Sequence, residues 1–399
     1  FIIDLDDSAG SVILRSSGTN GDMIFQGDDG GSNITALTLD MSASGKAIFN
    51  AGVTYGGDLI SSTAGTDNFV AGVNAGNSIV SGGSRNTLVG DEAGTAITTS
   101  DDNTAFGYNA LASDTNGFKS TALGKAALAT QNYSSGTDAF NVAVGFNSGN
   151  LLTTGVQNTL IGSSSGDAIT DADFNVAVGY NTLSTDTLGS RSVAIGYEAL
   201  KTQNFTSATD AYNTAVGFHA GNDITTGLQN TLMGGLTGDH LTDADNNTAY
   251  GYAALTADTK GSKSTAIGQG TLAAQNFTSA TDSHNTAVGY QAGASVSTGI
   301  ANTFIGSISG DANTIGGENV ALGYGALGAN VSGDRSTAIG YLALSNQNNG
   351  TTTFDANNTA VGFHAGLSIT TGTRNVAVGA DALTSADSDG RNIAIGYAA

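Results

Sequence analysis

One short pattern recurs from residue 68 to residue 399 and limits what this chain can fold into. It consists of Asn or Ser, Thr or Val, Ala, a larger apolar residue and Gly, as in NTAVG at residues 213–217. Successive copies are mostly about 17 residues apart, and every fourth spacing is about four residues longer. Four copies form a unit of about 72 residues, which occurs four times before a shortened fifth. Self-similarity of this kind indicates an array of stacked units rather than ordinary globular domains.

Each copy predicts a short β-strand that ends at a tight bend. Its residues alternate in character and are rich in β-branched side chains, and the Gly suits a bend. Helical spacing of apolar residues is absent, which argues against helices. Strands this short cannot bury a core alone, but coils stacked about 4.8 Å apart can. We therefore predict an all-β parallel β-solenoid, or β-roll, of about 19 coils over residues 61–399, a rod on the order of 90 Å long.

Residues 1–60 lack the pattern and are predicted to form a separate, irregular β-strand segment that serves as a shaft or connector. Short alternating stretches such as DMIFQGDD (22–29) are separated there by Gly and Asp, which are typical of turns. Because the chain opens at Phe1 without an initiator Met, we expect it to belong to a longer or processed polypeptide.

The alternation within each strand assigns its faces. The Ala of the pattern points to one side, and the Thr or Val and the larger apolar residue point to the other. An Ala face is flat, so we expect it to pack between chains around the axis of an oligomer, most simply a homotrimer. The alternative is that Ala fills the narrow interior of a single chain. In the second copy of each unit a bulky residue replaces Ala and is expected to fill the same intersubunit layer. The residues assigned to this packing are Ala143, Ala215, Ala287, Leu88, Leu160, Leu232 and Phe304.

Composition excludes several classes of protein. With 34 acidic and 12 basic residues the formal charge is −22, which disfavours binding to nucleic acid or to anionic membranes. The chain has no Cys, so it has neither a disulfide framework nor a thiolate metal site. It has no apolar run of the roughly 18 residues that a membrane span needs, and we expect no membrane insertion in this segment.

The repeat motifs resemble the head repeats of trimeric autotransporter adhesins, which read like SVAIG followed by a short Ala/Gly stretch. The matching stretches are SVAIGYEAL (192–200), STALGKAAL (120–128), STAIGYLAL (336–344) and NIAIGYAA (392–399). The resemblance covers residues 68–399 and implies a trimeric, left-handed parallel β-roll with one repeat per coil. The coils here are longer than is usual in that family, and no neck, stalk or membrane anchor is visible.

A second resemblance concerns GGSNITALTLDMSASGKAIFN (30–50), which is similar to segments found before such repeats in tail fibres of marine bacteriophages. It favours a phage tail fibre over a bacterial adhesin. Both readings place the chain outside the cell, on a virion or on a bacterial surface.

The long connections of the wider spacings are candidate ligand-binding bulges. They carry Tyr133, Phe205 and Phe277 at the same place in successive units, and aromatic rings beside Asn and Asp suit the faces and edges of sugars. A host-cell glycan or protein is the expected partner. The alternative is that each ring folds back and covers its own bulge.

A basic residue also recurs once in each complete unit, at Lys119, Arg191, Lys263 and Arg335. We expect a ladder of salt bridges with Asp residues, for which Asp114, Asp186 and Asp258 lie shortly before in the sequence. Recognition of an anionic glycan is the alternative.

Acidic pairs precede the third strand of three units: Asp101 with Asp102, Asp171 with Asp173, and Asp243 with Asp245. Clustered carboxylates suit Ca²⁺, but the fourth unit lacks the pair, which favours solvated turn residues. We assign no cofactor and no metal.

No arrangement of nucleophile, base and acid emerges from the sequence, so we predict no enzyme activity. The expected function is that of a structural fibre and adhesion protein, the trimeric rod of a phage tail fibre or a similar surface filament. The alternatives are the head of a bacterial trimeric autotransporter adhesin and a glycan-cleaving tailspike.

Overall fold

The computed structural model describes residues 5–6, 11–12, 23–29, 32–40, 46–49, 65–348, 350–385 and 390–399. The chain divides into two compact units, Phe1–Ile60 and Ser61–Ala399. The described part is all-β and contains no helix, and therefore none that could cross a membrane.

The first compact unit contains two small antiparallel sheets. Strands β1 (Leu5–Asp6) and β2 (Ser11–Val12) form one pair. Strands β3 (Met23–Asp29), β4 (Ser32–Asp40) and β5 (Lys46–Phe49) form the other sheet, in that order.

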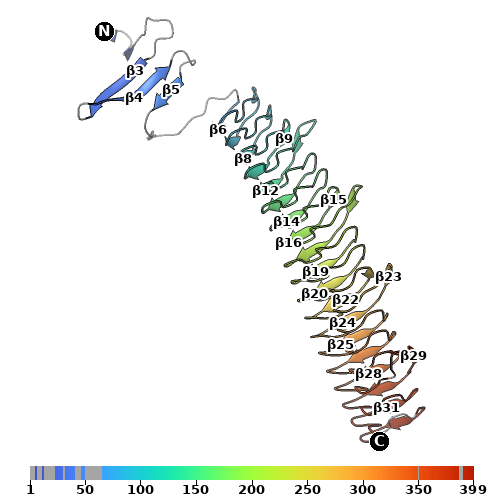
Figure 1. The fold of residues 1–399 in the computed structure, drawn as a ribbon. Helices are drawn as coiled ribbons and strands as arrows, with labels where there is room; N and C mark the ends of the chain where they lie inside the picture. The colour runs from blue at the N-terminus through green and yellow to red at the C-terminus, as the bar shows by residue number, and fades with distance from the viewer. Residues whose placement is uncertain are drawn as a thin grey trace. The chain divides into compact units, whose positions relative to one another are not determined.

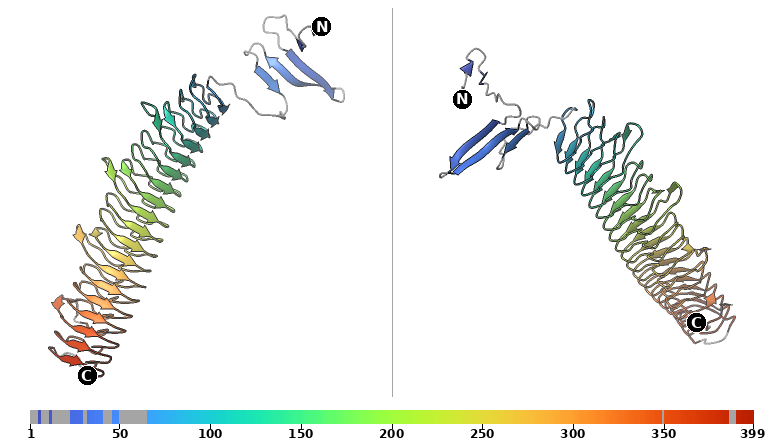
Figure 2. Two further views of the ribbon diagram at one scale, coloured as in Figure 1. Left: turned by 180° about the vertical axis from the view of Figure 1, so that it is seen from behind. Right: turned by 45° about the horizontal axis from the view of Figure 1, so that its top comes forward.

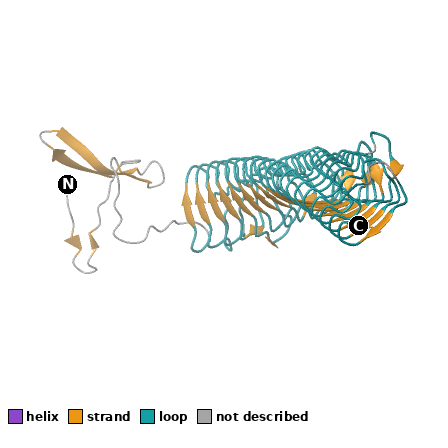
Figure 3. Ribbon diagram, turned by 90° about the horizontal axis from the view of Figure 1, so that it is seen from below, coloured by secondary structure: helices purple, strands orange, loops and turns teal. Residues whose placement is uncertain are grey.

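The second compact unit is a parallel β-solenoid of about 19 coils, as the repeat predicts (Figure 1). Each copy of the pattern contributes one three-residue strand, and each strand pairs in register with the strands of the neighbouring coils. Leu232, for example, lies between Ala215 and Ala249. The strands run along one side of the coils, and loops complete each turn (Figure 3). The strands of this long sheet are β6 (Phe69–Ala71), β7 (Thr87–Val89), β8 (Thr104–Phe106), β10 (Thr121–Leu123), β12 (Val142–Val144), β13 (Thr159–Ile161), β14 (Val176–Val178), β16 (Val193–Ile195), β18 (Thr214–Val216), β19 (Thr231–Met233), β20 (Thr248–Tyr250), β22 (Thr265–Ile267), β24 (Thr286–Val288), β25 (Thr303–Ile305), β26 (Val320–Leu322), β28 (Thr337–Ile339), β30 (Thr359–Val361), β31 (Val376–Val378) and β32 (Ile393–Ile395).

Four flaps project from one edge of the solenoid, one in each complete repeat unit (Figures 1 and 2). Each flap is a parallel pair of two-residue strands, of which the first ends the third coil of the unit and the second ends the longer, fourth coil. The pairs are β9 (Gly117–Phe118) with β11 (Thr137–Asp138), β15 (Gly189–Ser190) with β17 (Thr209–Asp210), β21 (Gly261–Ser262) with β23 (Thr281–Asp282), and β27 (Gly333–Asp334) with β29 (Phe354–Asp355).

The Gly that ends each strand is required by both conformation and space. Gly217 has a φ of +146°, a region that side chains other than hydrogen rarely allow. A Cβ at this position would collide with the backbone carbonyl of Gly234 in the next coil. The stacked glycines therefore let the corners of successive coils approach at the spacing of a sheet.

The Ala of each strand points into the interior of its own chain. Ala143, Ala215 and Ala287 are fully buried in a single chain, and so are Leu88, Leu160, Leu232 and Phe304. The predicted alternation of faces is therefore correct, but the assignment of these seven residues to intersubunit packing is wrong. The interior of the single chain is filled by these residues together with other buried side chains such as Leu128, Ile169 and Leu255, and a buried side chain has no surface to offer another chain.

Large and small residues alternate along this interior. In the second coil of a repeat unit, the side chain of Leu232 lies over Gly221 of the first coil and Gly238 of its own coil. In the third coil the order is reversed, because Ala249 stands in the strand and Leu255 occupies the position equivalent to Gly238. Both Leu255 and Gly238 have positive φ angles, 53° and 54°, so the backbone is the same and only the position of the bulk changes.

The Asn that opens the pattern forms a buried ladder of hydrogen bonds from coil to coil. Oδ1 of Asn158 accepts a hydrogen bond from the backbone N–H of Asn175 at 3.0 Å, and Nδ2 of Asn175 donates to the carbonyl of Gly189 at 2.9 Å. Fourth coils open with Ser instead, and Oε1 of Gln203 there accepts from Nδ2 of Asn213 at 2.8 Å. These buried amides satisfy backbone groups that no strand pairing reaches.

Candidate functional site

The three bulge aromatics are buried. Tyr133, Phe205 and Phe277 are only 4%, 6% and 6% exposed. The Phe205 ring packs over Gly189 of the flap, and the Tyr133 hydroxyl donates to the carbonyl of Gly155 at 2.7 Å. The flap is therefore held down by its own ring, and the prediction that these rings meet a ligand is wrong. The alternative, that each ring covers its bulge, is what the structure shows.

The recurring basic residues do form ion pairs, but with acidic residues of the next coil's flap strand. Lys119 Nζ lies 2.7 Å from Asp138, and Arg335 lies 2.5 Å from Asp355. The other two pairs are Arg191 with Asp210 and Lys263 with Asp282. All are largely exposed, so each contributes little to stability, and their regular placement instead sets the charge pattern of the flap edge.

The Asp residues expected as their partners lie inside the chain instead. Asp186 is buried; its Oδ1 accepts from the backbone N–H of Gly189 at 3.0 Å and its Oδ2 from Gln203 Nε2 at 2.5 Å. Asp114 and Asp258 make the same two contacts with their own Gly and Gln. Burial raises the pKa of Asp114 and of Asp186, because the charged form loses its hydration. In the fourth unit Asn330 takes this position.

The acidic pairs cap neighbouring turns. Asp173 Oδ1 accepts from the backbone N–H of Val156, and Asp245 Oδ1 accepts from that of Leu228, each at 2.7 Å. Asp101 and Asp102 both pair with Arg85. Across the residues that the structure describes, no three His, Asp or Glu side chains converge on a common point that would suit a metal ion. The geometry favours the turn interpretation over a Ca²⁺ site.

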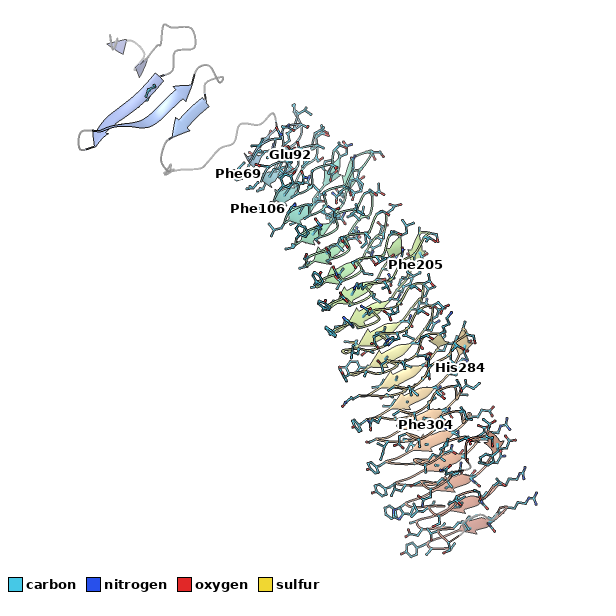
Figure 4. All side chains as sticks on the ribbon, in the orientation of Figure 1. Phe69, Glu92, Phe106, Phe205, His284 and Phe304 are labelled. Atoms are coloured by element: carbon cyan, nitrogen blue, oxygen red, sulfur yellow. The ribbon has the colours of Figure 1, made fainter. Side chains whose placement is uncertain are left out.

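The most extensive exposed feature is a double column of apolar side chains, which we call the apolar stripe. Its first column is the third residue of each of the eighteen strands of the long sheet from β7 to β32, and its second is the aromatic residue that follows the strand's Gly in eleven of these coils. In Figure 4 Phe106 lies at the stripe edge of the rod, and Phe205 lies at the opposite, flap edge. The first column comprises Val89, Phe106, Leu123, Val144, Ile161, Val178, Ile195, Val216, Met233, Tyr250, Ile267, Val288, Ile305, Leu322, Ile339, Val361, Val378 and Ile395. The second comprises Tyr108, Phe146, Tyr180, Tyr197, Phe218, Tyr252, Tyr290, Tyr324, Tyr341, Phe363 and Tyr397.

The rings of the stripe stack from coil to coil. Tyr197 lies between Tyr180 and Phe218, with ring centroids 5.5 and 5.4 Å apart. In an earlier coil Lys125 takes the equivalent place, with its Nζ 5.9 Å from the Tyr108 ring and 5.5 Å from the Phe146 ring. The stacks fix the rings at the surface without removing them from water, since most remain about half exposed.

The stripe was not identified from the sequence, although the signal was present. The larger apolar residue of each copy was placed correctly on the face opposite Ala, and a thin coil has room for only one of those faces inside. A comparison of coil volume with side-chain volume would have put Ala inside and left the larger residue outside.

Comparison with protein families, with characterised proteins and with solved structures gives no significant match for this chain.

Proposed function

We propose that the chain is a structural rod that associates with copies of itself, most simply two others, through the apolar stripe. Its role would be that of a fibre or adhesion protein, in a phage tail fibre or a similar surface filament. The observation that carries this proposal is that the first column of the stripe, the third residue of each strand, is apolar in every coil from β7 to β32.

The size of the stripe supports burial against another chain. An aromatic side chain presents about 150–250 Å², so eleven rings at about half exposure leave on the order of 1,000 Å² in water from one column alone. Soluble monomers rarely expose apolar patches above roughly 300–600 Å². A stable interface needs about 1,000 Å² or more in total, which the two columns together supply.

The form of the rod suits a spacer that carries an attachment function. Parallel coils transmit load along the axis through backbone hydrogen bonds, and the resemblance of the repeats to adhesin heads supports a trimer. A bacterial adhesin head remains the second candidate, favoured by the motifs at 192–200 and 336–344.

The test is the mass of the full chain in solution, measured by mass photometry across a range of concentrations. Ile267→Asp, which places a charge in the stripe, should lower the assembled mass to that of one chain, because an unpaired charge at an interface is strongly unfavourable. Ser279→Asp, on the exposed flap of the same unit, should leave the assembly intact. A wild-type chain that stays single at every concentration contradicts the proposal.

A further inference from the structure

The flaps share a tripeptide that their role in packing does not require. Asn132-Tyr133-Ser134, Asn204-Phe205-Thr206 and Asn276-Phe277-Thr278 each fit Asn-X-Ser/Thr, and the chain has no Pro to disqualify any of them. The fourth unit has a longer connection without the aromatic, yet it keeps Asn349-Gly350-Thr351, in which Asn349 lies outside the described residues. Asn-X-Ser/Thr is the acceptor motif for N-linked glycans in surface loops.

The acceptor amide is held by one end only. Oδ1 of Asn132, Asn204 and Asn276 accepts a hydrogen bond from a Thr hydroxyl of the preceding coil, at 2.8, 3.1 and 3.0 Å. Within the described residues, Nδ2 of these three side chains makes no hydrogen bond. Asn132 and Asn276 are exposed and Asn204 is partly exposed, so the amide that would carry a sugar belongs to a side chain that reaches solvent.

The second reactive group of the motif is also free. The hydroxyl residues Ser134, Thr206 and Thr278 are exposed, and in this part of the structure their side chains make no hydrogen bond. Each begins the bend of the flap, while the ring of the middle residue is buried and anchors the segment. The motif is thus presented by a fixed loop whose polar groups face outward.

Other copies of the motif in the rod are presented differently. Asn330-Val331-Ser332 has its Asn fully buried, with both amide atoms bonded to Gly333. Asn246-Asn247-Thr248 and Asn357-Asn358-Thr359 run directly into β20 and β30, so their Thr residues belong to the long sheet. Among the described residues of the rod, only the flap copies combine an open amide with a hydroxyl that is free of that sheet.

We propose that the flap residues Asn132, Asn204 and Asn276 are N-glycosylation acceptors. The donor is a sugar activated through its anomeric carbon as a diphosphate, used by a separate transferase. The amide nitrogen forms a bond to that carbon, the carbon–oxygen bond to the diphosphate breaks, and the diphosphate leaves with the electron pair. One amide proton passes to the base of the transferase.

Glycans at these positions are compatible with assembly through the stripe. Phe205, the neighbour of Asn204, lies at the edge of the rod opposite Phe106 (Figure 4). Sugars would therefore line the outer edge at intervals of four coils, roughly 19 Å, and leave the stripe free for another chain. The proposal does not depend on assembly.

The test is glycosylation of the folded full chain in vitro, followed by peptide mass mapping. One arm supplies a soluble transferase with nucleotide-activated glucose, and the other a membrane transferase with a lipid-linked diphosphate sugar. We expect one sugar at each of Asn132, Asn204 and Asn276 in at least one arm, which identifies the donor. Asn330 should stay unmodified until the chain is unfolded in urea, when it should react as the others do.

Variants separate the motif from the fold. The triple change Ser134→Ala, Thr206→Ala, Thr278→Ala should abolish modification of the three sites, whereas Thr206→Ser should keep the sugar on Asn204. Circular dichroism should show the same folded rod in each. Absence of sugar at all three sites in both arms overturns the proposal, as does modification of Asn330 in the folded chain to the same extent as the flap sites.

Discussion

Leu232→Ala removes the bulk that fills the interior between two coils. The side chain is fully buried, and its methyl groups lie 2.8 and 3.0 Å from where a Cβ would stand at Gly221 and Gly238. Two glycines cannot collapse into the space that the missing side chain leaves. The cost should therefore lie within the range of about 2–5 kcal/mol seen for buried Leu→Ala changes.

The alternation of bulk supplies a rescue. Leu232→Ala combined with Gly238→Leu recreates the arrangement of the next coil, where Ala249 accompanies Leu255. The new Leu meets the end of the Leu241 side chain, which has to rotate, and it adopts a left-handed conformation at a cost of about 1–2 kcal/mol. The double variant should therefore recover part of the lost stability, but not all of it.

The assay is urea unfolding followed by circular dichroism, with hydrogen exchange on peptides that cover residues 217–251. Because each coil contacts only its neighbours, the loss of protection should centre on these coils. Leu228→Ala, at a half-buried position in the turn before Asn230, is the matched control and should cost less. Unchanged unfolding of Leu232→Ala, or a double variant less stable than the single, would refute the account of the interior.

Two further predictions concern buried polar groups. Burial raises the pKa of Asp186 above its unfolded value, so the stability that this group provides is present at acidic pH and is lost as pH rises through the folded pKa. The variant Asp186→Asn, which Asn330 shows to be compatible with the fold, should raise the urea midpoint of unfolding at pH 7 and flatten its pH dependence between pH 4 and 7. The control is Thr226→Ala, which changes an exposed turn. Both amide atoms of buried Asn313 lack a hydrogen-bond partner, and Leu241 fills the equivalent place one unit earlier. The variant Asn313→Leu should therefore raise the free energy of unfolding by about 1–3 kcal/mol in the same urea assay. A loss of stability would show that the space around Phe304 leaves no room for Leu.

The course of the chain could be predicted because its signal is local. A strand of three residues and a Gly corner are set by alternation and by backbone conformation, and the many repetitions of the pattern make that signal unmistakable. The Asn ladder has the same local origin, because the Asn of one coil stands next to the Asn of the neighbouring coil wherever both coils open with Asn. These Asn side chains bond to one another, as Asn230 Nδ2 does to Asn213 Oδ1 at 3.3 Å, and also to backbone groups, as Asn230 Nδ2 does to the carbonyl of Ala244 at 2.8 Å.

The functional positions were harder to predict because exposure depends on volume. The spacing of Phe205 correctly indicated a projecting connection, but the ring lies inside because Gly189 leaves a gap beneath it. Asp186 was assigned to Arg191 by proximity in sequence, whereas the fold turns it inward toward Gln203 and leaves Asp210 facing Arg191. In both cases two residues in different coils decide the outcome, and sequence spacing alone does not say which of them meet.

The contrast between interior and surface supports our proposal that the stripe contacts another chain. Interior positions repeat every four coils because each side chain has to fit the residues it packs against, as Leu232 does over Gly221 and Gly238. Surface positions are free of that constraint and vary, as Lys125 and Tyr197 do in one and the same slot. The third strand residue is exposed or half-buried, so packing within the chain does not require it to be apolar, yet it is apolar in every coil from β7 to β32. A column of side chains that stays apolar from β7 to β32, in a chain with a formal charge of −22, fits continuous contact with another rod better than a small binding site at one point along it.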